Sequence, residues 1–139
     1  MIREAKIGDL KGVCEVLESA FADPNMYPEE WNERVSQGIH TFVGIINGEV
    51  IATYSVLLER KIIHNGGMVG HLEDFAILPE FRGLGYGKQM IDHVMEFCKE
   101  NNCYKVIHNC QESLVPYYEK YSKMRVHEVS MRRDFDVYP

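Results

Sequence analysis

The stretch MVGHLEDFAILPEFRGLGYGKQMIDHVMEFC, residues 68–98, contains the pattern that decides the fold. Its first part, residues 68–78, is rich in apolar residues and predicts a buried strand that carries two adjacent acids. A proline and the loop RGLGYGK, residues 82–88, come next. Apolar residues then recur at the spacing of one helix face, namely Met90, Ile91, Val94, Met95 and Cys98. The stretch therefore predicts a strand, a glycine-rich loop and a helix in that order.

The glycine-rich loop has the chemistry of an anion site. Free backbone N–H groups converge at a helix N-terminus, where the helix dipole adds partial positive charge, and glycines let a ligand approach the backbone closely. Arg82 and Lys88 add a cation at each end. The spacing of Gly83, Gly85 and Gly87 differs from the dinucleotide and P-loop motifs. The loop by itself therefore indicates either a pyrophosphate site or a tight turn without a ligand.

The remaining patterns predict a mixed sheet with helices on its faces, in a single α/β (α+β) domain over residues 1–139. The clearest local signal is Asn47-Gly48, which joins two β-branched runs and favours a type I′ hairpin turn. Helices are expected over residues 9–21, 28–37 and 116–121, and strands over residues 2–5, 41–46, 49–59, 103–110 and 126–135.

The composition of the 139 residues limits the function classes. The formal net charge of −6 argues against a nucleic-acid partner. No stretch is long and apolar enough to cross a membrane, and the charged N-terminus is unlike a secretory signal, so we expect a cytoplasmic protein. The four cysteines lack the paired spacing of zinc sites, which predicts reduced thiols and no metal: Cys14, Cys98, Cys103 and Cys110.

Several motifs together resemble one known family. RGLGYGK matches the R/Q-x-x-G-x-G/A pyrophosphate loop of the GNAT superfamily of acyl-CoA N-acyltransferases. In order and spacing, ERKIIH (59–64), GHLEDFAI (70–77), CYKVI (103–107) and YYEK (117–120) resemble the eukaryotic-type glucosamine-6-phosphate N-acetyltransferases within it. The resemblance implies the GNAT fold, which is a mixed, mostly antiparallel central sheet with helices on both faces and a bulged, splayed strand pair. It also implies acetyl-CoA as cosubstrate.

The resemblance assigns a cofactor site. Backbone amides after the bulge would bind the pantetheine arm, and one of them would polarise the thioester carbonyl. Tyr118 falls where the family has a tyrosine near the CoA sulfur, which would stabilise or protonate the leaving thiolate. The residues implied for CoA are Phe75, Ala76, Ile77, Arg82, Gly83, Leu84, Gly85, Tyr86, Gly87, Lys88, Tyr118 and Lys120.

The resemblance also assigns an aminosugar-phosphate site, with cations for the phosphate and carboxylates for the sugar. Catalytic roles fall on Tyr118, Glu73 and Asn109, although the family has an acid where this chain has Asn109. The base is then Glu73, His64 or a water chain, or the substrate differs from that of the family. The last-strand arginine of the family corresponds to Arg132 or, as the preferred choice, Arg133. The implied substrate residues are Lys61, Ile62, Ile63, His64, Glu73, Asp74, Tyr104, Lys105, Asn109 and Arg133.

The function implied is N-acetyl transfer from acetyl-CoA to glucosamine 6-phosphate by direct attack of the amine. The product, N-acetylglucosamine 6-phosphate, feeds the synthesis of UDP-N-acetylglucosamine. Two alternatives stay open, namely the same reaction on another small primary amine (an unphosphorylated aminosugar, a polyamine or an amino acid) and a non-catalytic CoA-binding module. A relay through Cys110 is a minor alternative to direct attack. The resemblance further implies a homodimer.

Overall fold

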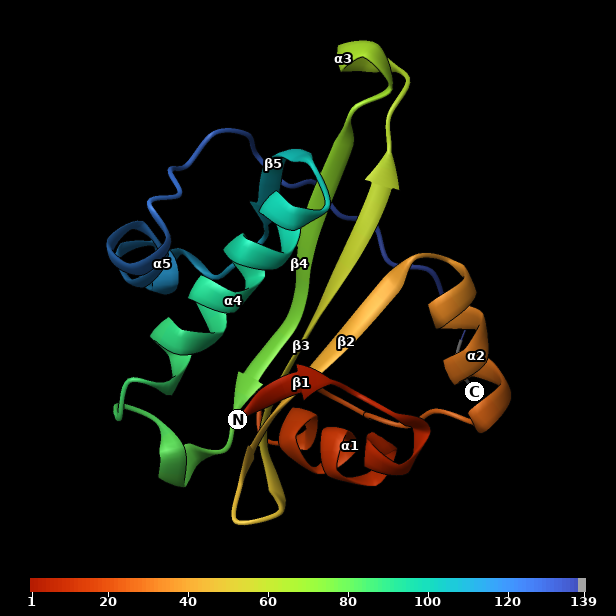
Figure 1. Ribbon diagram of the computed structural model, residues 1–139, viewed down its shortest axis with the longest axis vertical. Coiled ribbons are helices and arrows are strands. Elements are labelled where there is room, and N and C mark those ends of the chain that lie inside the picture. Colours follow the sequence, from red (N-terminus) through yellow and green to blue (C-terminus); the bar gives the residue numbers. More distant parts are fainter. Residues whose placement is uncertain (138–139) are drawn as a thin grey trace.

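A five-stranded sheet runs through the centre of the chain in the computed structural model, which describes residues 1–137 (Figure 1). Neighbouring strands pair antiparallel, except for the last two, which are parallel. A parallel pair needs a long crossover, and a helix provides it here. In spatial order the strands are β1 (Ile2–Glu4), β2 (Ile39–Ile46), β3 (Glu49–Arg60), β4 (Met68–Ile77) and β5 (Cys103–His108).

Helices cover both faces of the sheet, as the sequence predicts (Figure 1). On one face lie α1 (Leu10–Glu18) and α2 (Pro28–Ser36), and on the other lie α4 (Tyr86–Glu100) and α5 (Val115–Ser122). The short α3 (Ile63–Gly66) forms the tip of the β3–β4 hairpin. Turns of 3₁₀-helix occur at Ile7–Asp9, Pro79–Phe81 and Glu112–Leu114.

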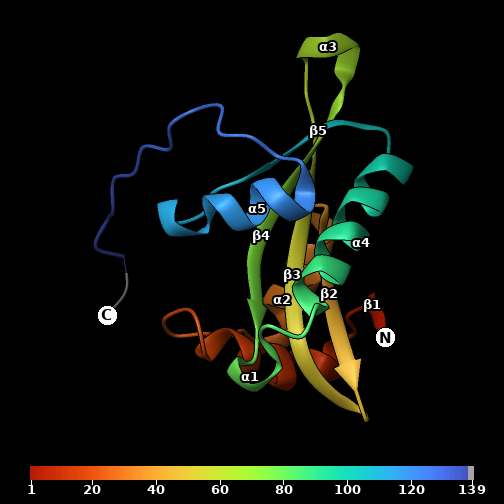
Figure 2. The ribbon, with the colours of Figure 1, turned by 90° about the vertical axis from the view of Figure 1, so that its left-hand side faces the viewer.

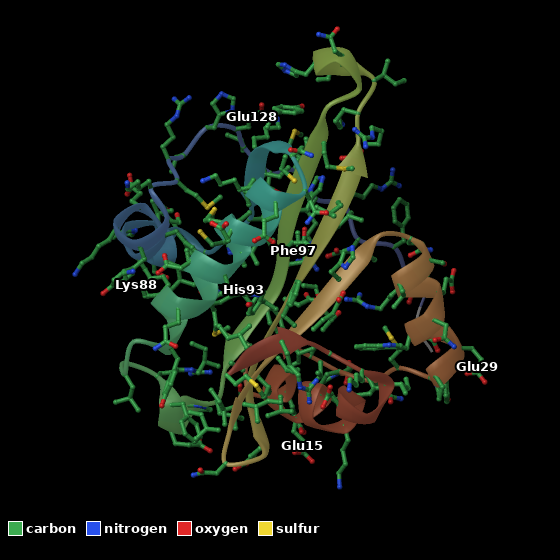
Figure 3. The ribbon with its side chains drawn as sticks, viewed as in Figure 1. Glu15, Glu29, Lys88, His93, Phe97 and Glu128 are labelled. Carbon is green, nitrogen blue, oxygen red and sulfur yellow. The ribbon has the colours of Figure 1, made fainter. Side chains whose placement is uncertain are left out.

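Side chains along β3 point alternately to the two faces of the sheet. Tyr54 and Val56 pack against α4, whereas Ser55 faces the α1/α2 side. The Tyr54 hydroxyl lies 2.7 Å from Nδ1 of His93, and His93 projects from α4 toward the sheet (Figure 3). Burial lowers the pKa of His93 and so keeps its ring neutral among the aromatic side chains.

Local signals explain most element boundaries. Asn47 and Gly48 have φ of 51° and 77°, the left-handed pair that a type I′ turn requires, so the hairpin prediction is confirmed. A proline at the first helical position starts α2 at Pro28. Buried Met90, Ile91 and Val94 fix α4 on the sheet, and each contributes roughly 1.5–3 kcal/mol.

The predicted last strand does not form within this chain. Residues 123–137 contain no helix or strand and run along the outside of the molecule (Figure 2). Val129 is 90% exposed and Met131 is 93% exposed. A strand needs a neighbouring backbone edge for its hydrogen bonds, and this segment pairs with none within residues 1–137. The alternating pattern is present, but its partner edge is not supplied here.

Candidate active site

A bulge in β4 creates the site. Ser55 is opposite Glu73 and Thr53 is opposite Ala76, so β4 has one more residue than β3 over this step. Asp74 takes the extra position with φ of 50°, a left-handed conformation that an aspartate tolerates better than most residues. The bulge that the resemblance implied is therefore confirmed.

The bulge coincides with the separation of β4 from β5. Their parallel pairing ends at Leu72 and His108, yet β4 continues to Ile77. The Leu78 N–H donates to the Ile51 carbonyl of β3 at 2.9 Å. Because the N–H groups along a strand point alternately to its two sides, the Ala76 N–H also points toward β3. The backbone groups of Phe75 and Ile77 consequently face the opening. Of the three amides expected to bind the cofactor, the Ala76 amide is thus used by the sheet.

The glycine-rich loop presents a row of free donors. The Arg82 N–H bonds the Pro79 carbonyl at 3.2 Å, but the N–H groups of residues 83–88 have no acceptor within residues 1–137. Gly83 and Gly85 have φ of 75° and 90°, which accounts for glycine at both positions. The free N–H groups at the start of α4 fit a diphosphate group such as that of acetyl-CoA.

The two cations of the loop are bound by their own chain. Arg82 Nε donates to the Ile77 carbonyl at 2.9 Å, and Lys88 Nζ lies 2.7 Å from a carboxylate oxygen of Asp92. Lys88 itself is in the first turn of α4 (Figure 3). Gly87 packs so closely against the Tyr117 hydroxyl that a Cβ would not fit. The backbone of the loop is therefore held against α5, while Leu84 remains exposed.

Tyr118 lies beside the opening, on the face covered by α4 and α5. Its ring centroid is 6.1 Å from that of Phe75 and 4.6 Å from that of His108. His108 Nδ1 is 2.9 Å from the Leu72 carbonyl, which fixes the ring where the two strands part. Burial raises the pKa of Tyr118, so its hydroxyl keeps its proton, and that hydroxyl has no hydrogen-bond partner among the described residues. Such a phenol is available as a donor.

Cys110 and Lys120 are two further residues near Tyr118 that have a predicted role. Burial raises the pKa of the Cys110 thiol, which keeps the thiol protonated and gives no support to a cysteine relay. Lys120 Nζ lies 5.2 Å from the centre of the Tyr121 ring on the outside of α5. Within residues 1–137 no group of three or more His, Cys, Asp or Glu side chains is arranged to hold a metal ion.

The expected substrate residues fall into two separate clusters. Glu73, Asp74 and Asn109 lie where β4 and β5 part. The others gather at the hairpin tip, where the ring of His64 is 4.3 Å from that of Tyr104. At roughly 3.3 Å per residue, the distance from the start of β4 to Asp74 is about 20 Å. The tip cluster consists of Lys61, Ile62, Ile63, His64, Tyr104 and Lys105.

Lys61 and Ile62 lie at the hairpin tip, and Arg133 lies in the C-terminal segment. Lys61 Nζ lies 3.4 Å from a Glu59 carboxylate oxygen, and Ile62 is 98% exposed. Arg133 lies in the C-terminal segment with its guanidinium 5.1 Å from the Phe135 ring centroid. A single protomer therefore does not bring Lys61 and Ile62 to Glu73 and Asp74.

The structure adds a cavity that the sequence did not reveal. A hollow of about 240 Å³ lies between α1, α2, their connecting segment and the sheet. Its wall is largely apolar, and Asp74 reaches it from the bulge. Arg34, Thr41 and Ser55 provide further polar groups. The available signal was a hydroxyl residue in the middle of each of two largely apolar strands, Thr41 and Ser55, which the structure pairs opposite each other.

Comparison with known proteins accounts for this arrangement. The acetyltransferase (GNAT) family profile matches residues 10–122. The chain is 33% identical to the glucosamine 6-phosphate N-acetyltransferase of Arabidopsis thaliana over 97% of this chain and 96% of the relative. The crystal structure of that enzyme from the same plant superimposes with a TM-score of 0.87 at 31% identity, covering 98% of each chain. A Trypanosoma brucei acetyltransferase gives 0.89 at 31% identity, over 97% of this chain and 99% of the other. The chain belongs to the acetyltransferase (GNAT) family.

Proposed function

We propose that this enzyme transfers the acetyl group of acetyl-CoA to the amine of glucosamine 6-phosphate. The observation that carries the proposal is the opening of the sheet at the Asp74 bulge, with unpaired backbone on one side and the ring of Tyr118 next to it. The relative from Arabidopsis thaliana, a glucosamine 6-phosphate N-acetyltransferase, matches nearly the whole chain. Another of that name from Dictyostelium discoideum is 36% identical over 79% of this chain.

Each side of the opening has a role in the transfer. Acetyl-CoA supplies an activated acyl group when it is bound. The N–H groups of residues 83–88 bind its diphosphate, and the amides of Phe75 and Ile77 hold the pantetheine arm and the thioester oxygen. The protonated Tyr118 hydroxyl donates its proton to the departing sulfur, a contribution of roughly 10²–10⁴-fold, and recovers a proton from the second one that the attacking nitrogen loses. No covalent intermediate on the enzyme is required.

The acidic pair next to the opening receives the amine. Glu73 and Asp74 are both exposed and lie at the point where the strands part. Their carboxylates attract the substrate ammonium, and Glu73 takes its proton directly or through water. Asn109 follows β5 and accepts a hydrogen bond from the amine without taking a proton.

A homodimer would complete the phosphate end of the site. The two clusters of substrate residues are about 20 Å apart in one chain, which is too far for both to contact one sugar phosphate. The C-terminal segment, residues 123–137, exposes apolar side chains and contains Arg133. A second protomer could cover this segment and bring its own hairpin tip or arginine to the acidic pair. Sedimentation at assay concentration tests this, and a monomer that is fully active would refute the shared site.

One assay tests the function. Thiol release from acetyl-CoA is measured with glucosamine 6-phosphate, glucosamine, polyamines and amino acids, and CoA binding is measured by calorimetry. Turnover that is fastest on glucosamine 6-phosphate supports the proposal. Faster turnover on another amine refutes the substrate assignment, and CoA binding without turnover on any amine refutes the enzyme assignment.

A further inference from the structure

Arg34 is an unusual residue in the cavity on the α1/α2 side. Its guanidinium is half-buried, and Nη2 donates to Thr41 Oγ1 at 3.2 Å and to Ser55 Oγ at 3.0 Å. The two hydroxyl oxygens are themselves 3.0 Å apart, and both residues are buried. Two strands and α2 thus fix the position of one nitrogen of the guanidinium.

The remaining donors of this guanidinium are unused. An arginine has five N–H donors, and those on Nε and Nη1 have no acceptor among residues 1–137. No carboxylate of that part of the chain forms an ion pair with Arg34. A partly buried cation without an anionic partner is costly, which favours an anionic ligand in its place.

The position of Arg34 relates it to the acidic pair. Thr41, Ser55 and Glu73 form one row across β2, β3 and β4. Adjacent strands are roughly 5 Å apart, so Glu73 lies one strand away from the Ser55 hydroxyl that holds Arg34. Asp74 and Arg34 line the same cavity without pairing. A molecule that carries both an ammonium and an anionic group is complementary to the two charges of this cavity.

We infer that Arg34, held by Thr41 and Ser55, binds the anionic group of the acceptor and sets the preference for a phosphorylated amine. This inference rests on the proposed function and names the residue of the same protomer that distinguishes the phosphorylated from the unphosphorylated aminosugar. The largely apolar cavity wall, which includes Val13 and Trp31, contacts the carbon framework.

The test compares Arg34→Gln with wild type on glucosamine 6-phosphate and glucosamine. We expect the ratio of kcat/KM for the two amines to fall about tenfold to hundredfold, through KM for the phosphorylated amine, because a charge-assisted, forked hydrogen bond is lost. The KM for acetyl-CoA stays unchanged. Lys99→Gln, which removes an exposed charge from the end of α4, is the matched control and leaves the ratio unchanged.

Each outcome is decisive. If kcat/KM of Arg34→Gln falls equally for both amines, or does not fall for either, the ratio is unchanged and the role of Arg34 is refuted. The proposed function still stands in that case, provided that the wild-type enzyme acetylates glucosamine 6-phosphate. Wild-type protein that acetylates neither amine refutes the proposed function itself. If Arg34→Gln does not fold, Arg34→Lys is used with glucose 6-phosphate as a competitive probe. Its inhibition constant should rise at least about tenfold over wild type, and an unchanged constant overturns the inference.

Discussion

Replacing Tyr118 by phenylalanine tests the proposed catalytic role of its hydroxyl separately from packing, because the ring makes the packing contacts and the hydroxyl makes no hydrogen bond within residues 1–137. The ring is 7% exposed and packs against Phe75 and His108. The hydroxyl has no partner among the described residues, so its removal breaks no internal hydrogen bond. We expect the free energy of unfolding to change by less than about 1 kcal/mol.

The effect of Tyr118→Phe on turnover should be much larger. Burial raises the pKa of Tyr118, so the hydroxyl is protonated at every pH at which the enzyme is assayed. Loss of a positioned general acid lowers kcat by about 10²–10⁴-fold, which corresponds to about 3–5 kcal/mol in the barrier. The KM for acetyl-CoA should stay close to that of wild type, because the loop and β4 backbone are untouched.

The assay follows thiol release at saturating acetyl-CoA, with thermal unfolding of both proteins as the control. A lower kcat together with an unchanged melting temperature assigns the hydroxyl to the reaction. An unchanged kcat would remove Tyr118 from the mechanism. A parallel loss of kcat and stability would show that the hydroxyl supports packing instead.

Three further predictions follow from the same region. Gly87→Ala places a Cβ against the Tyr117 hydroxyl, so we expect the free energy of unfolding to fall by about 1–3 kcal/mol and the KM for acetyl-CoA to rise. Gly8→Ala is the control, because a Cβ at Gly8 meets nothing within 4 Å, and equal melting temperatures of the two variants would contradict the prediction. Burial raises the pKa of Tyr118 above its ordinary value of 10.0, so above that pH the unfolded state loses a proton that the folded state keeps. The free energy of unfolding, measured with urea, should therefore fall as the pH rises above 10.0, and it should fall less steeply in Tyr118→Phe. Asn109→Asp adds a carboxylate beside the opening and should raise kcat or shift its pH optimum; a pH profile identical to wild type would place the base elsewhere.

The sequence predicted those parts of the fold that depend on local signals. The Asn47-Gly48 turn, the helix after the glycine loop and the strand before it each have a signature within a short window. The prediction of a strand over residues 126–135 was wrong for a non-local reason, because an alternating run forms a strand only where a backbone edge is available.

Among the described residues none of the helices is long and apolar enough to span a bilayer.

The candidate site was predictable only in part, for similar reasons. The loop and Tyr118 lie in short motifs that the resemblance could locate. Arg34 comes from an ordinary amphipathic helix, and nothing in its window shows that two distant strands place hydroxyls beneath it. The separation of Lys61 from Glu73, by contrast, follows from the length of the β3–β4 hairpin, which the predicted strands over residues 49–59 and 68–78 already imply.

The bulge explains how one strand serves both sides of the sheet. Before it, even-numbered residues such as Gly70 and Leu72 face α4. After it, odd-numbered Phe75 packs on Tyr118, on the same face. A regular strand would direct Asp74 to the α4 side, because a shift of one residue reverses every side chain. The extra residue instead turns Asp74 to the cavity that contains Arg34, while the backbone of Phe75 faces the cofactor opening. Deleting Asp74 would remove its carboxylate from the cavity and restore the regular register of β4 against β3, so the shape of this region depends on a single residue insertion.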